Sequence, residues 1–161
     1  MIAAQKLLVI GGLALAIIGM SYGLYYALFD EHQTLEGMGM SLAKGFALAA
    51  ERNLPEAHGA IDDYGAIRYE YVREVHAHSH WISLSMVLIV LGIAFNRIAY
   101  GERARFLIAV TLVCGSLLFP LGSILQTFPL GMLAKVITGI GSIAVIGGLA
   151  TATLGLLLPE Q

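Results

Sequence analysis

Residues 81–98 read WISLSMVLIVLGIAFNRI, and this stretch decides the class of fold. Arg97 is its only charged residue, and its length approaches the about 20 apolar residues that cross a hydrocarbon core of about 30 Å as a helix. In lipid every backbone amide needs a partner within the protein, and a helix provides one for each residue along its length. The stretch therefore predicts a membrane-spanning helix.

Three further stretches have the same character: residues 7–29, 106–126 and 130–158. Four segments are too few to close a membrane β-barrel, so each is expected to be a helix. The first is longer than the apolar part of a signal peptide and is followed by charged residues at 30 and 31, which favours an uncleaved anchor. The sequence predicts an all-α, integral membrane four-helix bundle that forms a single domain over residues 1–161.

The composition of the whole chain agrees with this class. Of its 161 residues, 58% are hydrophobic and only 12% are charged, and the mean hydropathy is +0.80. Soluble domains have about 45–50% apolar and about 25% charged residues, so a lipid bilayer is the expected surrounding. The net charge of −2 and the absence of any basic run argue against a nucleic-acid partner. Cys114, the single cysteine, cannot form an internal disulfide.

Basic residues in the short loops predict the orientation in the membrane. Arg97, Arg103 and Arg105 surround the turn between the second and third spans, and Lys6 precedes the first. Short cytoplasmic loops are enriched in lysine and arginine, so we expect this turn and both termini to be cytoplasmic. Residues 30–80 then form one long outer segment, which in a bacterium lies on the periplasmic side of the inner (cell) membrane.

The first part of this outer segment has a helical pattern of its own. Residues 37–52 read GMGMSLAKGFALAAER, in which apolar side chains recur at helical spacing. Asn53 and Pro55 are expected to end this helix. His58 is expected to lie in the loop that follows.

The second part of the outer segment, residues 61–80, also has a helical period. No glycine or proline lies between Ile67 and Leu91. We therefore expect the helix to run from the outer segment into the second span without a break, so that residues 30–80 form a helical extramembrane segment.

Three of the five histidines fall within the string VHAHSHW, residues 75–81, where the second span begins. At 3.6 residues per turn, His76 and His80 share one face of a helix and His78 points to nearly the opposite side. Such a helix can offer two imidazoles to a metal ion in the i, i+4 arrangement, or one imidazole to a heme iron as an axial ligand. The string predicts His76, His78 and His80 as metal or cofactor ligands.

Two residues near the string are candidates to complete this site. His32 lies just past the first span, and because the first two spans are antiparallel neighbours, we expect it at the depth of His76. Glu74 lies one turn before His78 and could orient that ring. A plainer interpretation stays open, in which the histidines only anchor the helix at the membrane interface or join a hydrogen-bonded polar cap.

The string of residues 75–84, VHAHSHWISL, and the later GSLLFPLG of residues 115–122 resemble small four-helix bacterial membrane proteins related to heme-copper oxidase subunit I. Those short relatives carry His-Ala-His before an apolar helix, and in the long subunits a histidine near the outer end of that helix ligates the low-spin heme. The resemblance implies His76 or His78 as a heme ligand. It does not imply oxygen reduction, because the copper-site histidines have no counterpart here.

These observations give three hypotheses of different classes. The first is a heme b- or metal-binding membrane protein that acts in electron transfer or as a subunit of a respiratory-type complex. The second is a copper or zinc site in the same histidines, for metal handling or oxidation. The third is a structural subunit of a larger membrane complex. In each, the expected partners are the lipid bilayer and either further copies of the chain or a larger complex, and whether the protein is an enzyme stays open.

Overall fold

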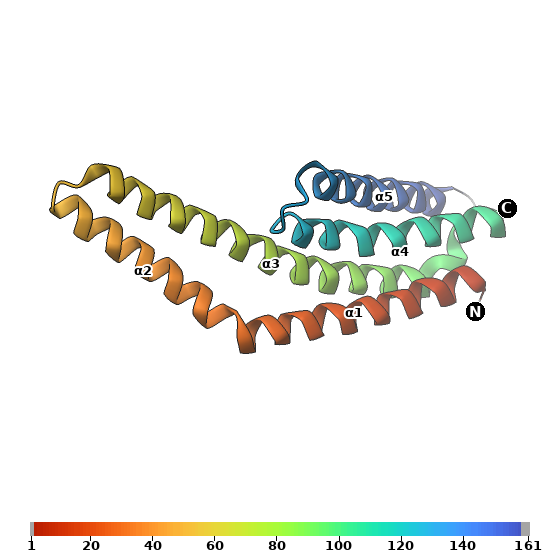
Figure 1. The fold of residues 1–161 in the computed structure, drawn as a ribbon. Coiled ribbons are helices and arrows are strands. Elements are labelled where there is room, and N and C mark those ends of the chain that lie inside the picture. The colour runs from red at the N-terminus through yellow and green to blue at the C-terminus, as the bar shows by residue number, and fades with distance from the viewer. Residues whose placement is uncertain (1, 159–161) are drawn as a thin grey trace.

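A computed structural model describes residues 2–158, and it is helical almost throughout (Figure 1). Its elements are α1 (Ala3–Phe29), α2 (Glu31–Ala50), α3 (Leu54–Ala94), the short 3-10 helix η1 (Phe95–Arg97), α4 (Glu102–Leu125) and α5 (Gly131–Leu157). The described part of the chain contains no strand. The predicted all-α class is therefore confirmed.

Four of these segments are long and apolar enough to cross a membrane: Ala3–Phe29, Leu54–Arg97, Glu102–Leu125 and Gly131–Leu157. Each contains or closely matches one of the four stretches predicted from the sequence. Their outward-facing side chains are large and apolar, for example Ile10, Ile17 and Ile143. A lipid surrounding accounts for this exposure, so the chain has the character of a multi-pass membrane protein.

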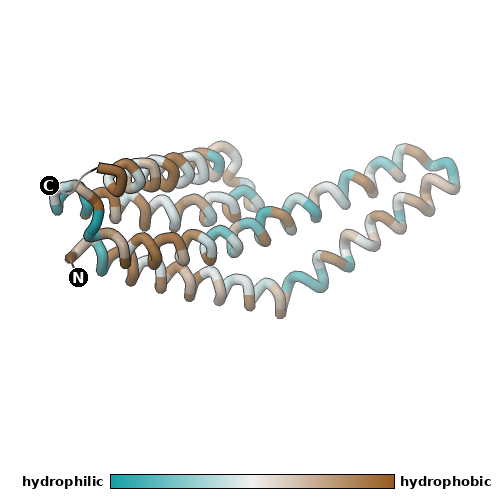
Figure 2. Tube along the Cα trace, turned by 180° about the vertical axis from the view of Figure 1, so that it is seen from behind, coloured by the Kyte–Doolittle hydropathy of each residue, from teal (hydrophilic) through white to brown (hydrophobic). Residues whose placement is uncertain are grey.

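Helix α3 is the longest element and organises the rest. Its 41 residues extend about 60 Å at 1.5 Å per residue, about twice the thickness of a hydrocarbon core. One half packs against α1 and α4 in the bundle, and the other half pairs with α2 as an antiparallel hairpin that projects from the bundle (Figure 1). The unbroken helix predicted from the outer segment into the second span is confirmed. Figure 2 shows that hydrophilic residues gather along this hairpin and at the opposite end of the bundle.

The hairpin extends one observation from the sequence and corrects one prediction. The outer helix begins at Glu31, directly after a break at Asp30, so it is longer than the stretch 37–52 that shows the helical pattern. His58 lies inside α3 and not in a loop, because α3 already begins at Leu54. Pro55 is the second residue of α3, a position where its missing N–H group costs no helical hydrogen bond. It therefore lies after the end of α2 and within the first turn of α3.

The helices of the bundle approach closely at glycines. A Cβ atom on Gly12 would lie 2.8 Å from the carbonyl oxygen of Ser85, and one on Gly92 would lie 3.1 Å from the Cβ of Leu8. Helices α4 and α5 are in similarly close contact at Gly115 and Gly141. Small residues at helix crossings are the usual means of packing in lipid, where dispersion contacts between the helices replace the hydrophobic effect.

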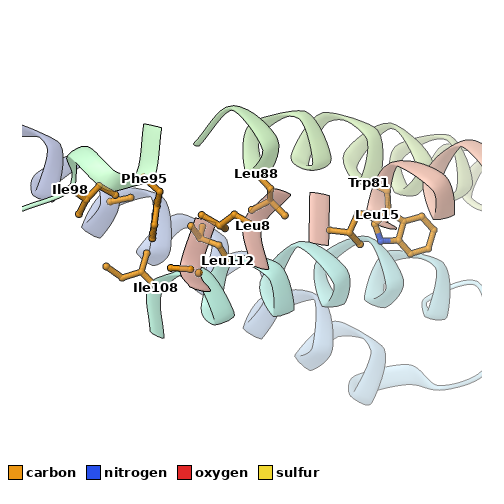
Figure 3. Packing of buried hydrophobic residues seen from close by; sticks show 11 residues of the cluster. Leu8, Leu15, Trp81, Leu88, Phe95, Ile98, Ile108 and Leu112 are labelled. Atoms are coloured by element: carbon orange, nitrogen blue, oxygen red, sulfur yellow. The ribbon is translucent and has the colours of Figure 1, made fainter. Parts of the chain in front are cut away.

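Large side chains fill the space between these crossings (Figure 3). One cluster joins Leu8 of α1, Leu88 of α3 and Leu112 of α4, and all three are almost fully buried. Figure 3 shows Trp81 beside Leu15 at one end of the same core. The core thus holds α1, α3 and α4 together and fixes the position of the α3 segment that carries the histidines.

Candidate functional site

The three clustered histidines lie on α3 where this helix passes from the bundle into the hairpin; we call this level the hairpin end of the bundle. The position follows from contacts on both sides. A Cβ atom on Gly23 of α1 would lie 3.3 Å from the ring of His78, and the ring centroid of His80 lies 4.7 Å from that of Phe119 on α4. The last turns of α1 and α4 therefore flank the histidines.

His76 and His80 share one face of α3, as predicted. Their ring centroids are 5.7 Å apart, with 46° between the ring planes. The His76 Nδ1 atom lies 3.0 Å from the carbonyl oxygen of Val72. A carbonyl oxygen can only accept, so Nδ1 carries the hydrogen in this contact, and the Nε2 atom of the neutral ring keeps its lone pair. This is the arrangement that orients metal-binding histidines in proteins.

The two rings of this pair have different surroundings. His76 is exposed, whereas His80 is half-buried against the ring of Phe119. Packing against α4 restricts the motion of the His80 ring, while the bond to the Val72 carbonyl restricts that of His76. Both imidazoles are therefore held in place by the protein, and less conformational entropy is lost when a ligand orders them.

His78 points the other way, into the contact between α3 and α1. Its Nδ1 atom is buried and has no hydrogen-bond partner, and the same holds for Nε1 of Trp81 and the hydroxyl of Tyr26. The aromatic rings of Tyr22 and Trp81 meet edge to face in this interface, with centroids 5.7 Å apart. His78 therefore does not share a site with His76 and His80 on this chain.

Glu74 does not orient His78 in the way expected, because the Nδ1 atom of that ring has no partner. Burial raises the pKa of the Glu74 carboxyl above its ordinary value, and the nearby carboxylates of Asp30 and Glu70 raise it further. The carboxyl group lies outside residues 81–98, at the base of the hairpin. It adds a weakly acidic group close to the histidines but no bond to them.

His32 contacts a residue of its own helix, Glu36, and none of the clustered histidines. Its side chain is 93% exposed, and its Nε2 atom is 4.0 Å from a carboxylate oxygen of Glu36 on the next turn of α2. Within residues 2–158, no three His, Cys, Asp or Glu side chains are grouped closely enough to hold a metal ion. The pair His76 and His80 is thus the part of the predicted ligand set that the structure brings together.

A polar cap lies beyond the histidines at the hairpin end. The Gln126 side chain donates to the hydroxyl of Thr138 at 2.8 Å, and the hydroxyl of Tyr69 donates to the amide oxygen of Gln126 at 3.5 Å. The guanidinium of Arg73 lies 5.0 Å from the centre of the Tyr69 ring. These contacts tie the ends of α4 and α5 to the base of the hairpin.

Sequence reasoning missed the two residues that shape the histidine surroundings, Gly23 and Phe119. Gly23 is one glycine among nineteen and carries no local signal, whereas Phe119 lies in the string 115–122, on which part of the family resemblance rests but which assigns Phe119 no role. Comparisons with protein-family models, with curated proteins and with solved structures gave no match.

Proposed function

We propose that this chain is a membrane protein that holds either a heme iron through the imidazole of His76 or a transition-metal ion through the imidazoles of His76 and His80. The observation that carries the proposal is the pair itself: two rings on one helix face, 5.7 Å apart, one of them with its Nδ1 atom bound to a backbone carbonyl. The site lies where a spanning helix leaves the bundle. A redox centre at this position serves electron transfer or a respiratory-type assembly.

Heme is the first candidate occupant. A single histidine can bind heme iron, and the bond from His76 Nδ1 to Val72 leaves the lone pair of Nε2 available to such an iron. A bound heme supplies one-electron transfer. The chain's own contribution is to orient the imidazole of His76 through the Val72 carbonyl. A second ligand to the heme would come from outside this pair, from a further copy of the chain or from another subunit.

Copper or zinc is the second candidate, and the i, i+4 spacing is the observation that favours it. Two neutral imidazoles four residues apart on a helix can bind one ion together. Imidazole ligands without thiolates suit copper(II) and zinc. Such a site needs further ligands, and water or a second protein chain can supply them.

An absorption spectrum of the purified protein in detergent separates these candidates. A heme protein is expected to show a strong Soret band that shifts on reduction with dithionite. A copper or zinc protein is expected to lack that band and to contain about one metal atom per site by elemental analysis after preparation without chelator. A colourless protein free of iron, copper and zinc contradicts the proposal and leaves the structural-subunit hypothesis.

We further propose that the hairpin lies on the outer side of a bacterial inner membrane, with both termini in the cytoplasm. Support comes from Arg97, Arg103 and Arg105, which lie with Lys6 at the end of the bundle opposite the hairpin. In a Cys114→Ser background, a cysteine at Ser41 is expected to react with an impermeant maleimide added to intact cells. A cysteine at Glu102 is expected to react only after the membrane is opened, and the reverse pattern contradicts the orientation.

A further inference from the structure

The α2–α3 hairpin carries an apolar surface outside the lipid-spanning part of the molecule. Near its tip, a groove of about 220 Å³ lies between the two helices. Leu42, Phe46 and Ala49 of α2 form one wall, and Leu54, His58 and Ile61 of α3 form the other. Phe46 is 75% exposed, Leu54 58% and Ile61 53%. Lipid does not explain this exposure so far along the hairpin, so another molecule is needed to cover it.

The apolar groove belongs to one continuous flank of the hairpin. On α2 the positions Leu35, Gly39, Leu42, Phe46 and Ala49 alternate in steps of four and three residues, so they share one side of the helix. On α3 the positions Leu54, His58, Ile61 and Gly65 follow the same rule. We call these nine residues the apolar flank. None of them is an acid, a lysine or an arginine.

Two glycines of the apolar flank have no role within the chain. A Cβ atom on Gly39 or on Gly65 would meet no other atom within 4 Å. Glycine inside a helix costs about 1 kcal/mol relative to alanine, and the internal packing gives no compensation at these two positions. Glycines facing outward allow a second helix to approach the backbone closely, as small residues do at helix crossings.

We propose that the apolar flank is the contact surface for a second copy of this chain, with the two hairpins side by side. Both copies are inserted in the same direction in one membrane, so the two-fold axis that relates them is parallel to the membrane normal. Each residue of the flank then contacts residues of the other copy at the same distance from the membrane. A charged residue on the flank would therefore lie close to the same charged residue of the other copy, and none of the nine positions is an acid, a lysine or an arginine.

The charge of the remaining hairpin surface supports this choice. Residues 30–80 contain nine acidic and four basic side chains, a net charge of −5. Lys44 lies on the opposite side of α2 from Phe46, since two residues turn a helix by about 200°. Two acidic hairpins repel each other except where the flank is uncharged. The same acidity disfavours binding of the hairpin to anionic lipid headgroups.

The size of the flank is compatible with a dimer inside one membrane. The flank extends about 21 Å along α2 and about 17 Å along α3, so with a width of about 20 Å it offers about 400 Å² per copy. Two such faces bury about 800 Å², less than the about 1,200 Å² of specific interfaces between freely diffusing proteins. Confinement of both copies to one membrane raises their effective concentration, so a smaller interface is sufficient.

Cross-linking of the full-length protein, purified and reconstituted in vesicles of zwitterionic lipid, tests the proposal. In a Cys114→Ser background, Phe46→Cys and Gly39→Cys are placed on the flank, and Lys44→Cys is the matched control at the same height on the other side. A short bis-maleimide is expected to yield a dimer band at both flank positions, at least about tenfold stronger than at Lys44→Cys. Adding Ile61→Glu to Phe46→Cys is expected to reduce that band, because two carboxylates then meet across the interface.

Three cross-linking results each overturn the proposal: monomer at both flank positions, equal cross-linking at flank and control positions, or no effect of Ile61→Glu. Quenching of a probe on Phe46→Cys by brominated lipids also overturns it, because the flank then lies on the bilayer. The cross-linking experiment measures only the amount of covalent dimer. It is therefore independent of whether His76 and His80 bind a metal.

Discussion

Replacing His76 and His80 together with alanine is expected to remove the bound heme or metal ion from the protein. Loss of a residue that only hydrogen-bonds to a metal ligand typically weakens metal binding about 10- to 100-fold, and loss of a direct ligand has the larger effect. For a metal ion held by both rings we therefore expect each single substitution to weaken binding at least about 100-fold, and for heme we expect this of His76→Ala. The double substitution is expected to leave no occupancy in either case. The Soret absorbance, or the metal content per chain, measures this directly.

The matched control for this experiment is His32→Ala. His32 is an exposed histidine of the hairpin, and it belongs neither to the His76 and His80 pair nor to the apolar flank. Occupancy is expected to be unchanged in this variant. His78→Ala is expected to leave occupancy intact as well, because its ring faces α1 rather than the pair. Loss of occupancy in His78→Ala with retention in His76→Ala would reverse the assignment of the ligands.

Introducing a side chain at Gly12 is expected to separate α1 from α3 and to destabilise the bundle. A Cβ atom there would lie 2.7 Å from a side-chain carbon of Ile89 and 2.8 Å from the backbone oxygen of Ser85. Backbone of a neighbouring helix cannot move aside as a side chain can, so we expect Gly12→Leu to cost at least the about 1–3 kcal/mol typical of overpacking. The midpoint of thermal unfolding in detergent, followed by fluorescence of Trp81, is the measurement.

Gly147→Leu provides the comparison for Gly12→Leu. Gly147 also lies within a membrane-spanning helix, but a Cβ atom on it would meet no atom of the chain within 4 Å. Its substitution is expected to leave the midpoint unchanged or slightly higher, because leucine favours helix more than glycine does. Equal midpoints for the two variants would show that the close crossing at Gly12 does not limit packing.

The elements that could be predicted from the sequence are those set by local pattern. The four spans follow from the length of apolar runs, and the continuity of α3 follows from the lack of glycine and proline between Ile67 and Leu91. The shared face of His76 and His80 follows from helical spacing alone. These features need no knowledge of which helix packs against which.

The elements that could not be predicted depend on contacts between distant parts of the chain. The break at Asp30 has no glycine or proline to mark it, and α2 takes its direction from packing of Gly45 against Ala57 and Ala60 of α3. The close contact between Gly23 and the ring of His78 depends on the register between α1 and α3. That register cannot be predicted from a single sequence. The identity of any bound ion depends on ligands beyond the pair, and it stays a prediction.

The unbroken course of α3 couples the geometry of the two ends of this helix. One residue inserted between Gly65 and His76 would move the tip end of α3 by about 1.5 Å and turn it by about 100° relative to the imidazoles, and α2 would have to follow to keep its contacts with that end. Four inserted residues would restore nearly the original direction, about 6 Å higher. The number of residues in this segment therefore sets the distance of the tip from the bundle. It also sets the direction, around the α3 axis, in which the tip can contact another molecule.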